Sequence, residues 1–216
     1  MTYRIDAVVC LNGDIPGADF FARHAAKPLI AADGAALKLR SHGILPTVIA
    51  GDMDSIGDVP AAERESLFPG AEWLWLPDQE SNDFEKILVA AHSRGMTSLL
   101  VCGMHGGDLE HTLNNWSVLM RYAWTHTLFV ADRDRIAIPV VDVLELSCLP
   151  GDTVSLIPQP AARITTRGLQ WELRDEYLEL GVREGARNIA LSERVVIRVH
   201  EGSLLVFFDS GRVRIA

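Results

Sequence analysis

Short apolar runs alternate with helical patterns in the first part of this chain, and the alternation stops after Val130. The runs at 7–11, 28–32 and 98–102 are almost wholly apolar, and each ends close to a glycine, asparagine or aspartate. Such runs between helices are typical of strands that are buried on both faces. They therefore predict a parallel sheet with helices on both sides.

The rest of the chain lacks a helical pattern of convincing length. Apolar runs at 140–146, 153–157, 195–199 and 204–208 are separated by glycine, proline, asparagine and aspartate. This pattern favours a small antiparallel β-sandwich or barrel. The sequence thus predicts an N-terminal α/β domain over residues 1–134 and an all-β domain over residues 135–216.

Charge and composition narrow the possible partners and compartments. The formal net charge is −9 and no basic run occurs, which argues against nucleic acid as a partner. No apolar stretch approaches the roughly 18 residues of a membrane span. Cys10, Cys102 and Cys148 are far apart and form no CxxC pair, so we expect free thiols in a reducing cytoplasm.

Aspartates follow several of the predicted strands. Asp33 follows the run at 28–32, Asp52 and Asp54 follow a further apolar run at 47–50, and Asp83 opens a predicted helix. Strand-end side chains of a parallel sheet meet at one edge, where carboxylates would repel one another without a cation. Oxygen ligands favour a hard cation, Mg²⁺ first, and Mg²⁺ usually accompanies a phosphate substrate.

Each of these motifs also has a purely structural interpretation. Asp52 and Asp54 could simply form a polar turn, although residues i and i+2 of an extended chain point the same way. Asn82 is a good helix N-cap, Glu85 suits a capping box, and Asp83 suits the helix dipole. Lys86 could neutralise phosphate or be a solvated helix lysine.

A glycine-rich turn at 103–108 precedes another helix. Gly106 and Gly107 would let backbone N–H groups approach an anion at the helix start. No GxxxxGK[ST] or GxGxxG motif is present. His105, Glu110 and His111 lack HExxH spacing, so capping or hydrogen bonding is favoured over zinc binding.

Trp171 lies in the β-rich part, within the run 168–171. A tryptophan in a small β domain is usually a core residue. Exposed on a surface, its ring would suit a flat cationic ring through stacking and cation–π attraction.

These motifs, in this order, resemble those of the thiamine pyrophosphokinase family. The family's GDxDS motif is matched in full at 51–55, and Ala-Asp-Gly is matched at 32–34. The family's aspartate-rich segment is matched in part by Asp78, Gln79, Asp83, Lys86 and Leu88, and its G-G-R-x-D-H helix start by Gly106, Gly107 and His111. The resemblance spans nearly the whole chain.

Three departures from the family pattern stand out. Asp108 replaces the family arginine, Glu110 replaces an aspartate, and Arg187 replaces the serine before Asn188. An anion near a polyphosphate should weaken nucleotide binding unless another base compensates. The candidates for that compensation are Lys86, Arg121, Arg133 and Arg135.

The resemblance implies transfer of a diphosphoryl group from ATP to thiamine, giving thiamine diphosphate and AMP, in a homodimeric enzyme. It implies Mg²⁺ held by Asp33, Asp52, Asp54 and Asp83, with Asp54 or Asp83 accepting the hydroxyl proton. Residues expected to bind the nucleotide are Gly13, Asp33, Gly34, Ser55, Gln79, Asn82, Lys86, Gly106, Gly107 and His111. Those expected to bind thiamine are Leu169, Trp171 and Asn188.

Other functions remain open from the residues. A metal-dependent phosphoesterase could use the same carboxylates with water as the acceptor. A diphosphokinase for another heterocyclic alcohol would share the phosphate site. A non-catalytic nucleotide- or thiamine-binding homologue is the third alternative, motivated by Asp108 and Glu110.

Overall fold

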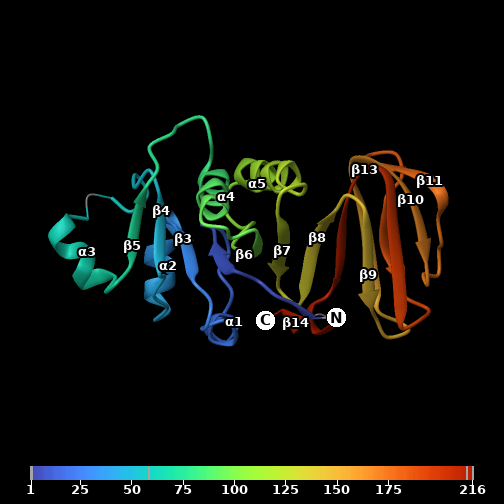
Figure 1. Cartoon of the computed structure of the whole chain (residues 1–216), viewed down its shortest axis with the longest axis horizontal. Coiled ribbons are helices and arrows are strands. Elements are labelled where there is room, and N and C mark those ends of the chain that lie inside the picture. The colour runs from blue at the N-terminus through green and yellow to red at the C-terminus, as the bar shows by residue number, and fades with distance from the viewer. Residues whose placement is uncertain (1, 58, 213, 216) are drawn as a thin grey trace. The chain divides into compact units, whose positions relative to one another are not determined.

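The computed structural model describes residues 2–57, 59–212 and 214–215, which form two compact units (Figure 1). The α/β unit runs from Ile5 to Tyr122, and the β unit comprises the residues before Ile5 and those from Ala123 onward. None of the described helices is both long and apolar enough to cross a membrane.

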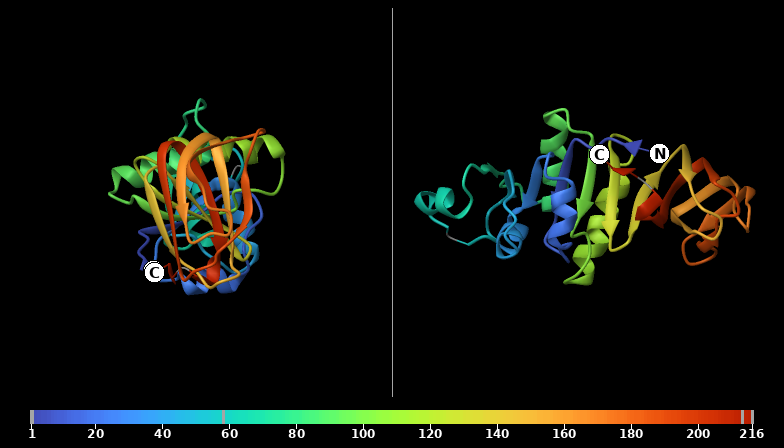
Figure 2. Two further views of the ribbon diagram at one scale, coloured as in Figure 1. Left: turned by 90° about the vertical axis from the view of Figure 1, so that its right-hand side faces the viewer. Right: turned by 90° about the horizontal axis from the view of Figure 1, so that it is seen from below.

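The α/β unit contains a parallel sheet with the strand order β6-β2-β3-β4-β5. Helices lie on both sides of these strands in the right-hand view of Figure 2, as the apolar runs predict. The strands are β2 (Ala7–Cys10), β3 (Leu29–Ala32), β4 (Val48–Gly51), β5 (Glu72–Trp75) and β6 (Ser98–Cys102). The helices are α1 (Ala18–Arg23), α2 (Asp33–Ser41), α3 (Ala61–Leu67), α4 (Asp83–Ser93) and α5 (Leu109–Arg121).

Three sequence predictions are visible in the structure. All four residues of β2 and of β3 are buried, which matches their continuous apolar character. The side chain of Asn82 accepts a hydrogen bond from the Glu85 amide at 2.9 Å and so caps α4. Cys10 and Cys102, on the neighbouring strands β2 and β6, are buried free thiols, as is Cys148.

The β unit is an antiparallel assembly built around two long strands, and the left-hand view of Figure 2 looks onto it. Neighbouring strands of its sheet lie in the order β11 (Arg174–Glu179), β10 (Thr153–Arg167), β13 (Arg194–Asp209), β8 (Arg135–Val140) and β7 (Thr127–Asp132). β12 (Gly185–Ile189) also pairs with β10, β9 (Val143–Ser147) also pairs with β13, and β1 (Thr2–Tyr3) pairs with β14 (Arg214–Ile215). The α/β and antiparallel β architectures predicted from the sequence are both confirmed.

The long strands differ from the short runs expected from the sequence. The runs 195–199 and 204–208 are the two ends of β13, which continues through Gly202. Gly202 has φ +77°, and a Cβ there would lie 2.1 Å from the Ala161 carbonyl oxygen. This glycine therefore allows the strand to bend beside β10 where the sequence suggests a turn.

The division between the units falls at 122/123, before β7. The sequence suggests a boundary at 134/135 instead, because the alternation of apolar runs and helical patterns stops only after Val130. In the structure β7 pairs antiparallel with β8 across a tight turn, with Val130 opposite Ala137. That hairpin groups β7 with the β unit; where the two functional parts divide stays a prediction.

Candidate active site

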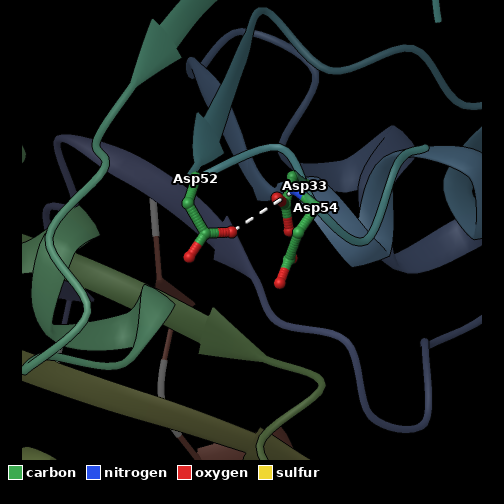
Figure 3. A group of neighbouring side chains, drawn as sticks. All are labelled: Asp33, Asp52 and Asp54. Carbon is green, nitrogen blue, oxygen red and sulfur yellow. Dashed lines mark hydrogen bonds between the residues drawn. The ribbon is translucent and has the colours of Figure 1, made fainter. Parts of the chain in front are cut away.

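The carboxylates of Asp33, Asp52 and Asp54 come together at the carboxyl end of the parallel sheet. Asp33 directly follows β3 and begins α2, while Asp52 and Asp54 follow β4. One oxygen from each lies within 4.8 Å of the others, and Figure 3 shows Asp52 turned toward the other two. Three oxygen donors at this spacing suit a hard divalent cation.

Asp33 is the buried member of this cluster, with no exposed surface. Its oxygens accept hydrogen bonds from the Gly34 amide at 2.6 Å and from the Met53 amide at 2.7 Å. Burial raises the pKa of Asp33, these two amides partly oppose the rise, and the neighbouring carboxylates of Asp52 and Asp54 add to it. A cation beside Asp33 would relieve this unfavourable concentration of negative charge.

A glycine immediately before Asp52 permits this arrangement. A Cβ at Gly51 would lie 2.7 Å from the Asp33 carboxyl carbon. The glycine of the GDxDS motif is therefore required for packing against Asp33, in addition to any role in the turn.

Lys86 neutralises one side of the cluster. Its Nζ lies 3.0 Å from Asp52 Oδ2 and 3.6 Å from Asp83 Oδ1, and the residue is 7% exposed. Gln79 Nε2 donates to the same Asp52 oxygen at 3.0 Å. The hydrogen bond from Lys86 is the main reason that the pKa of Asp52 falls to about 2. The alternative that Lys86 is a solvated helix lysine is therefore wrong.

Asp83 lies at the start of α4 and is half-buried. Burial is the main cause that raises its pKa to about 6; the charge of Asp33 adds to this, while Lys86 opposes it. Asp83 is not one of the three aspartates whose oxygens lie within 4.8 Å of one another. Its role as a fourth metal ligand stays a prediction.

A cavity of about 270 Å³ lies beside the cluster. It gathers many of the residues that the sequence singles out, and also residues that the sequence reasoning missed. The predicted residues that line it are Asp52, Asp54, Ser55, Gln79, Asn82, Asp83, Lys86 and His111, and the further ones include Asn12 and Asn115.

Asn115 and Asn12 support the walls of this cavity. Asn115 accepts a hydrogen bond from Asn82 Nδ2 at 3.0 Å and donates one to the Met104 carbonyl oxygen at 3.2 Å. The sequence held a signal for Asn115, because it stands four residues after His111 and so shares its helix face. A Cβ at Gly34 would lie 2.5 Å from Asn12 Nδ2, which explains the glycine there.

The glycine-rich turn packs against the loop that follows β2. The Gly13 amide donates to the Gly103 carbonyl oxygen at 3.0 Å, and a Cβ at Gly106 would lie 2.2 Å from Asp14 Oδ1. The Gly13 amide is thus already hydrogen-bonded within the protein and is not directed at a phosphate site; its role in nucleotide binding stays a prediction. Gly107, with open space around a Cβ position, remains the accessible glycine of this turn.

Asp108 precedes α5 at its N-cap position but makes no side-chain cap, and it is exposed. Of the bases considered as its compensation, Arg121 pairs with Glu85 at 2.7 Å, and Arg133 and Arg135 belong to the β unit. Within the α/β unit, Lys86 is the candidate that lines the cavity.

Trp171 is 57% exposed, so its interpretation as a core residue is wrong. Asn188 is buried and uses its amide group on the backbone of this tryptophan: Oδ1 accepts from the Trp171 amide at 3.1 Å and Nδ2 donates to its carbonyl oxygen at 2.8 Å. Leu169 is 2% exposed. The two buried residues therefore anchor the loop, and Trp171 presents its ring to the surface.

Two family models match this chain, one after the other along the sequence. The family model described as "Thiamin pyrophosphokinase, catalytic domain" matches residues 22–130, and "Thiamin pyrophosphokinase, vitamin B1 binding domain" matches residues 142–204. Thiamine pyrophosphokinase 1 of Arabidopsis thaliana is 31% identical over 183 residues, covering 79% of this chain and 67% of that protein. Thiamine pyrophosphokinase 1 of rice (Oryza sativa subsp. japonica) is 30% identical, covering 77% and 67%.

Solved structures show the same fold at lower sequence identity. The thiamin pyrophosphokinase of Geobacillus thermodenitrificans superposes with a TM-score of 0.77 at 20% identity, covering 97% of this chain and 98% of that one. The enzyme of Candida albicans gives a TM-score of 0.77 at 16% identity, covering 96% and 92%.

Proposed function

Because this chain belongs to the thiamin pyrophosphokinase family, and is thus a thiamine diphosphokinase, we propose that its carboxylate cavity is where the diphosphoryl group passes from ATP to thiamine. The observation that carries the proposal is the cluster of Asp33, Asp52 and Asp54, which lies inside the segment matched by the catalytic-domain model. The products are thiamine diphosphate and AMP.

Mg²⁺ is the cation that we propose for this site. Asp33, Asp52 and Asp54 supply only oxygen donors, and burial, with a smaller contribution from the two neighbouring carboxylates, raises the pKa of Asp33. When bound, Mg²⁺ would neutralise and orient the polyphosphate of ATP. Lys86 and Gln79, which both contact Asp52 Oδ2, would fix the direction of that carboxylate.

Asp83 is our choice for the base over Asp54. It faces the same cavity but stands outside the group of aspartates that suits the cation, so its carboxylate is not needed for the cation and can accept a proton. In the proposed reaction the thiamine hydroxyl oxygen bonds to the β-phosphorus in line. The bond between that phosphorus and the α–β bridging oxygen breaks, AMP leaves, and the hydroxyl proton goes to Asp83.

Trp171 is proposed to stack on a cationic ring of thiamine, supported by its exposure and by the anchoring of its loop. Asn188 and Leu169 then act by holding the loop in place. A homodimer, as the family resemblance implies, and a cytoplasmic location both stay predictions; light scattering of the purified protein tests the first.

The activity itself is tested by following AMP formation from ATP with Mg²⁺ and a small panel of alcohols. We expect AMP to appear only when thiamine is added. AMP formed equally without any alcohol would indicate a phosphoesterase, and AMP formed faster with another heterocyclic alcohol would change the acceptor. Tight binding of ATP and thiamine without turnover would indicate a non-catalytic homologue.

Replacing Trp171 with alanine should weaken thiamine binding by roughly five- to thirtyfold, because stacking on a cationic ring is worth about 1–2 kcal/mol when partly desolvated. ATP affinity should stay unchanged. Since the ring is exposed, the substitution should lower the free energy of unfolding by only about 0.5 kcal/mol. Replacing a core tryptophan with alanine would lower it by about 3–5 kcal/mol. Isothermal titration and thermal unfolding measure these quantities.

Trp124→Ala is a matched control for this experiment, because Trp124 is another exposed tryptophan in the β unit, at 70% exposure. It should leave thiamine affinity unchanged. Equal loss of thiamine affinity in both variants would remove Trp171 as the ring-binding residue.

Asp108→Arg should tighten ATP binding and raise kcat/KM for ATP by about two- to fivefold, the size expected for one exposed charge interaction. Asp108 makes no side-chain cap, so its replacement costs no helix cap. Asp108→Asn separates loss of the negative charge from gain of a positive one. An inert or slower Asp108→Arg enzyme would mean that Lys86 already fills the role of the family arginine.

A further inference from the structure

A row of three hydrogen bonds links the first turn of α4 to the glycine-rich turn that follows β6. The Glu85 amide donates to Asn82 Oδ1 at 2.9 Å, and Asn82 Nδ2 donates to Asn115 Oδ1 at 3.0 Å. Asn115 Nδ2 in turn donates to the Met104 carbonyl oxygen at 3.2 Å. Both asparagines are half-buried and line the carboxylate cavity, and they come from the neighbouring helices α4 and α5 (Figure 1).

The order of donors and acceptors in this row fixes the orientation of both side-chain amides. Asn82 turns its oxygen toward the Glu85 amide, so its nitrogen faces Asn115. Asn115 must then turn its oxygen toward Asn82, so its nitrogen faces the Met104 carbonyl oxygen. An aspartate at position 115 would place a carboxylate oxygen against that carbonyl, and a leucine would leave both partners without their bond. Asparagine is therefore specifically suited to this position.

The carbonyl oxygen of Met104 belongs to a segment that the sheet holds in place. The carbonyl oxygens on either side of it, of Gly103 and His105, accept hydrogen bonds at 3.0 and 2.7 Å from two amides of the loop that follows β2. β2 and β6 are directly paired in the parallel sheet. Asn115 is thus bonded to a frame that is fixed by the sheet.

The other end of the row reaches the residue proposed as the base. Asn82 is the N-cap of α4, and Asp83 is the first residue of that helix. The amides of a first turn have no intrahelical partners, so the placement of this turn depends on its cap. Residues 77–80, just before the cap, are exposed. The bond to Asn115 therefore ties the cap to α5 and, through Met104, to the sheet.

We propose that Asn115 is a positioning residue, which acts through Asn82 to hold the first turn of α4, and with it Asp83, in place beside the carboxylate cluster. The inference rests on the proposed function, which makes Asp83 the base. A base must lie within hydrogen-bond reach of the hydroxyl group that it deprotonates, and a displacement of about 1 Å can cost about a hundredfold in rate. Asn115 needs no contact with ATP or thiamine for this role.

A purely structural role, in which Asn115 only joins α4 to α5, is the alternative. These helices have another contact, formed by residues that do not line the cavity: the Tyr122 hydroxyl donates to Glu85 Oε1 at 3.1 Å, and Arg121 pairs with Glu85 at 2.7 Å. Tyr122→Phe removes one bond of this contact and keeps the ring. It is therefore the matched control for the loss of a bond at this end of α4.

Asn115→Ala should lower kcat for AMP formation about ten- to hundredfold and change the KM values for ATP and thiamine by less than about twofold. Inorganic tripolyphosphate with Mg²⁺ should bind as it does to the unchanged protein, because the carboxylate cluster is untouched. Tyr122→Phe should leave kcat within about twofold of the unchanged enzyme, whatever its melting temperature. Steady-state kinetics, isothermal titration and thermal unfolding measure these quantities.

Asn82→Ser tests whether the effect passes through the cap. Serine is also a good N-cap, so the bond to the Glu85 amide is kept while the donor to Asn115 is lost. We expect kcat to fall about as far as in Asn115→Ala, and to fall no further when both substitutions are combined. Losses that multiply in the combined variant would overturn the inference. Asn82→Ser also keeps the inference testable if Asn115→Ala fails to fold, since an unchanged kcat in Asn82→Ser would overturn it too.

Two further results would overturn the inference. Weaker binding of tripolyphosphate to Asn115→Ala, with unchanged kcat, would mean that Asn115 contacts phosphate directly. A loss of kcat in Tyr122→Phe equal to that in Asn115→Ala would mean that any bond between α4 and α5 has this effect.

Asp83→Asn separates failure of this inference from failure of the proposed function. Near-normal turnover of Asp83→Asn would reject the base assignment, and this inference with it. If Asp83→Asn is slow, Asn115→Ala should slow it no further, because a base that is absent cannot be misplaced. Further slowing in that combined variant would overturn the inference and leave the base assignment standing.

Discussion

Replacing Asp54 with asparagine should lower the rate of AMP formation by about a thousandfold and leave the fold intact. The amide keeps the shape of the carboxylate but loses the charge that attracts Mg²⁺, and a bound metal contributes several kcal/mol to catalysis. Asp54 is exposed, and its side chain accepts a hydrogen bond from the Ser55 hydroxyl at 3.1 Å, so little stability depends on it. Steady-state kinetics and thermal unfolding at saturating Mg²⁺ measure both quantities.

Asp52→Asn provides an informative comparison. It should lose activity to a similar extent and also lose about 1–3 kcal/mol of unfolding free energy, because Lys86 would be left beside a neutral amide. Nζ of Lys86 lies 3.0 Å from Asp52 and its side chain is almost fully buried. Near-normal turnover of either variant at ordinary Mg²⁺ concentrations would exclude that residue as a metal ligand.

Asp83→Asn should slow AMP formation by about 10²- to 10⁴-fold, the usual contribution of a general base. Because Asp83 stands apart from the cluster of Asp33, Asp52 and Asp54, the affinity for Mg²⁺ with tripolyphosphate should change little. Loss of one charge at the start of α4 should cost about 0.3–1 kcal/mol of stability. Single-turnover kinetics report the chemical step, and titration reports the affinity.

Comparing Asp83→Asn with Asp54→Asn shows whether Asp83 acts as the base or as a fourth metal ligand. A base predicts slow chemistry with preserved metal and tripolyphosphate binding. A fourth metal ligand predicts that Asp83→Asn weakens Mg²⁺ as strongly as Asp54→Asn does. Asp83→Glu is a useful third variant, since it keeps the charge and moves the carboxylate by one methylene.

The carboxylates proposed for catalysis should destabilise the folded protein when no cation is bound. Asp33 and Asp83 have raised pKa values because burial and neighbouring carboxylates disfavour their charged forms. Lys86 offsets part of this repulsion through Asp52. Added Mg²⁺ is therefore expected to raise the melting temperature, as any ligand that binds only the folded state does.

Local patterns in the sequence were sufficient for the architecture and for the edge of the sheet where the aspartates meet. Continuous apolar strands between helices allow only a parallel sheet covered on both faces, and parallel strands bring their carboxyl ends to one edge. Asn82 as a helix cap also follows from local hydrogen bonding. These features depend on residues a few positions apart, so their periodicity is visible in the sequence.

Contacts between distant residues required the tertiary structure. Lys86 pairs with Asp52, 34 positions earlier in the chain, so its burial was invisible in the helix pattern. Trp171 is held at the surface by Asn188, 17 positions away, and a composition argument alone favoured the core. The change of pattern after Val130 suggests a boundary at 134/135, whereas the antiparallel pairing of β7 with β8 groups β7 with the β unit. The hydrophobic pattern indicates which segments form buried strands and helix faces, whereas the partner of each segment, and the exposure of a single side chain such as Trp171, depend on which segments pack together.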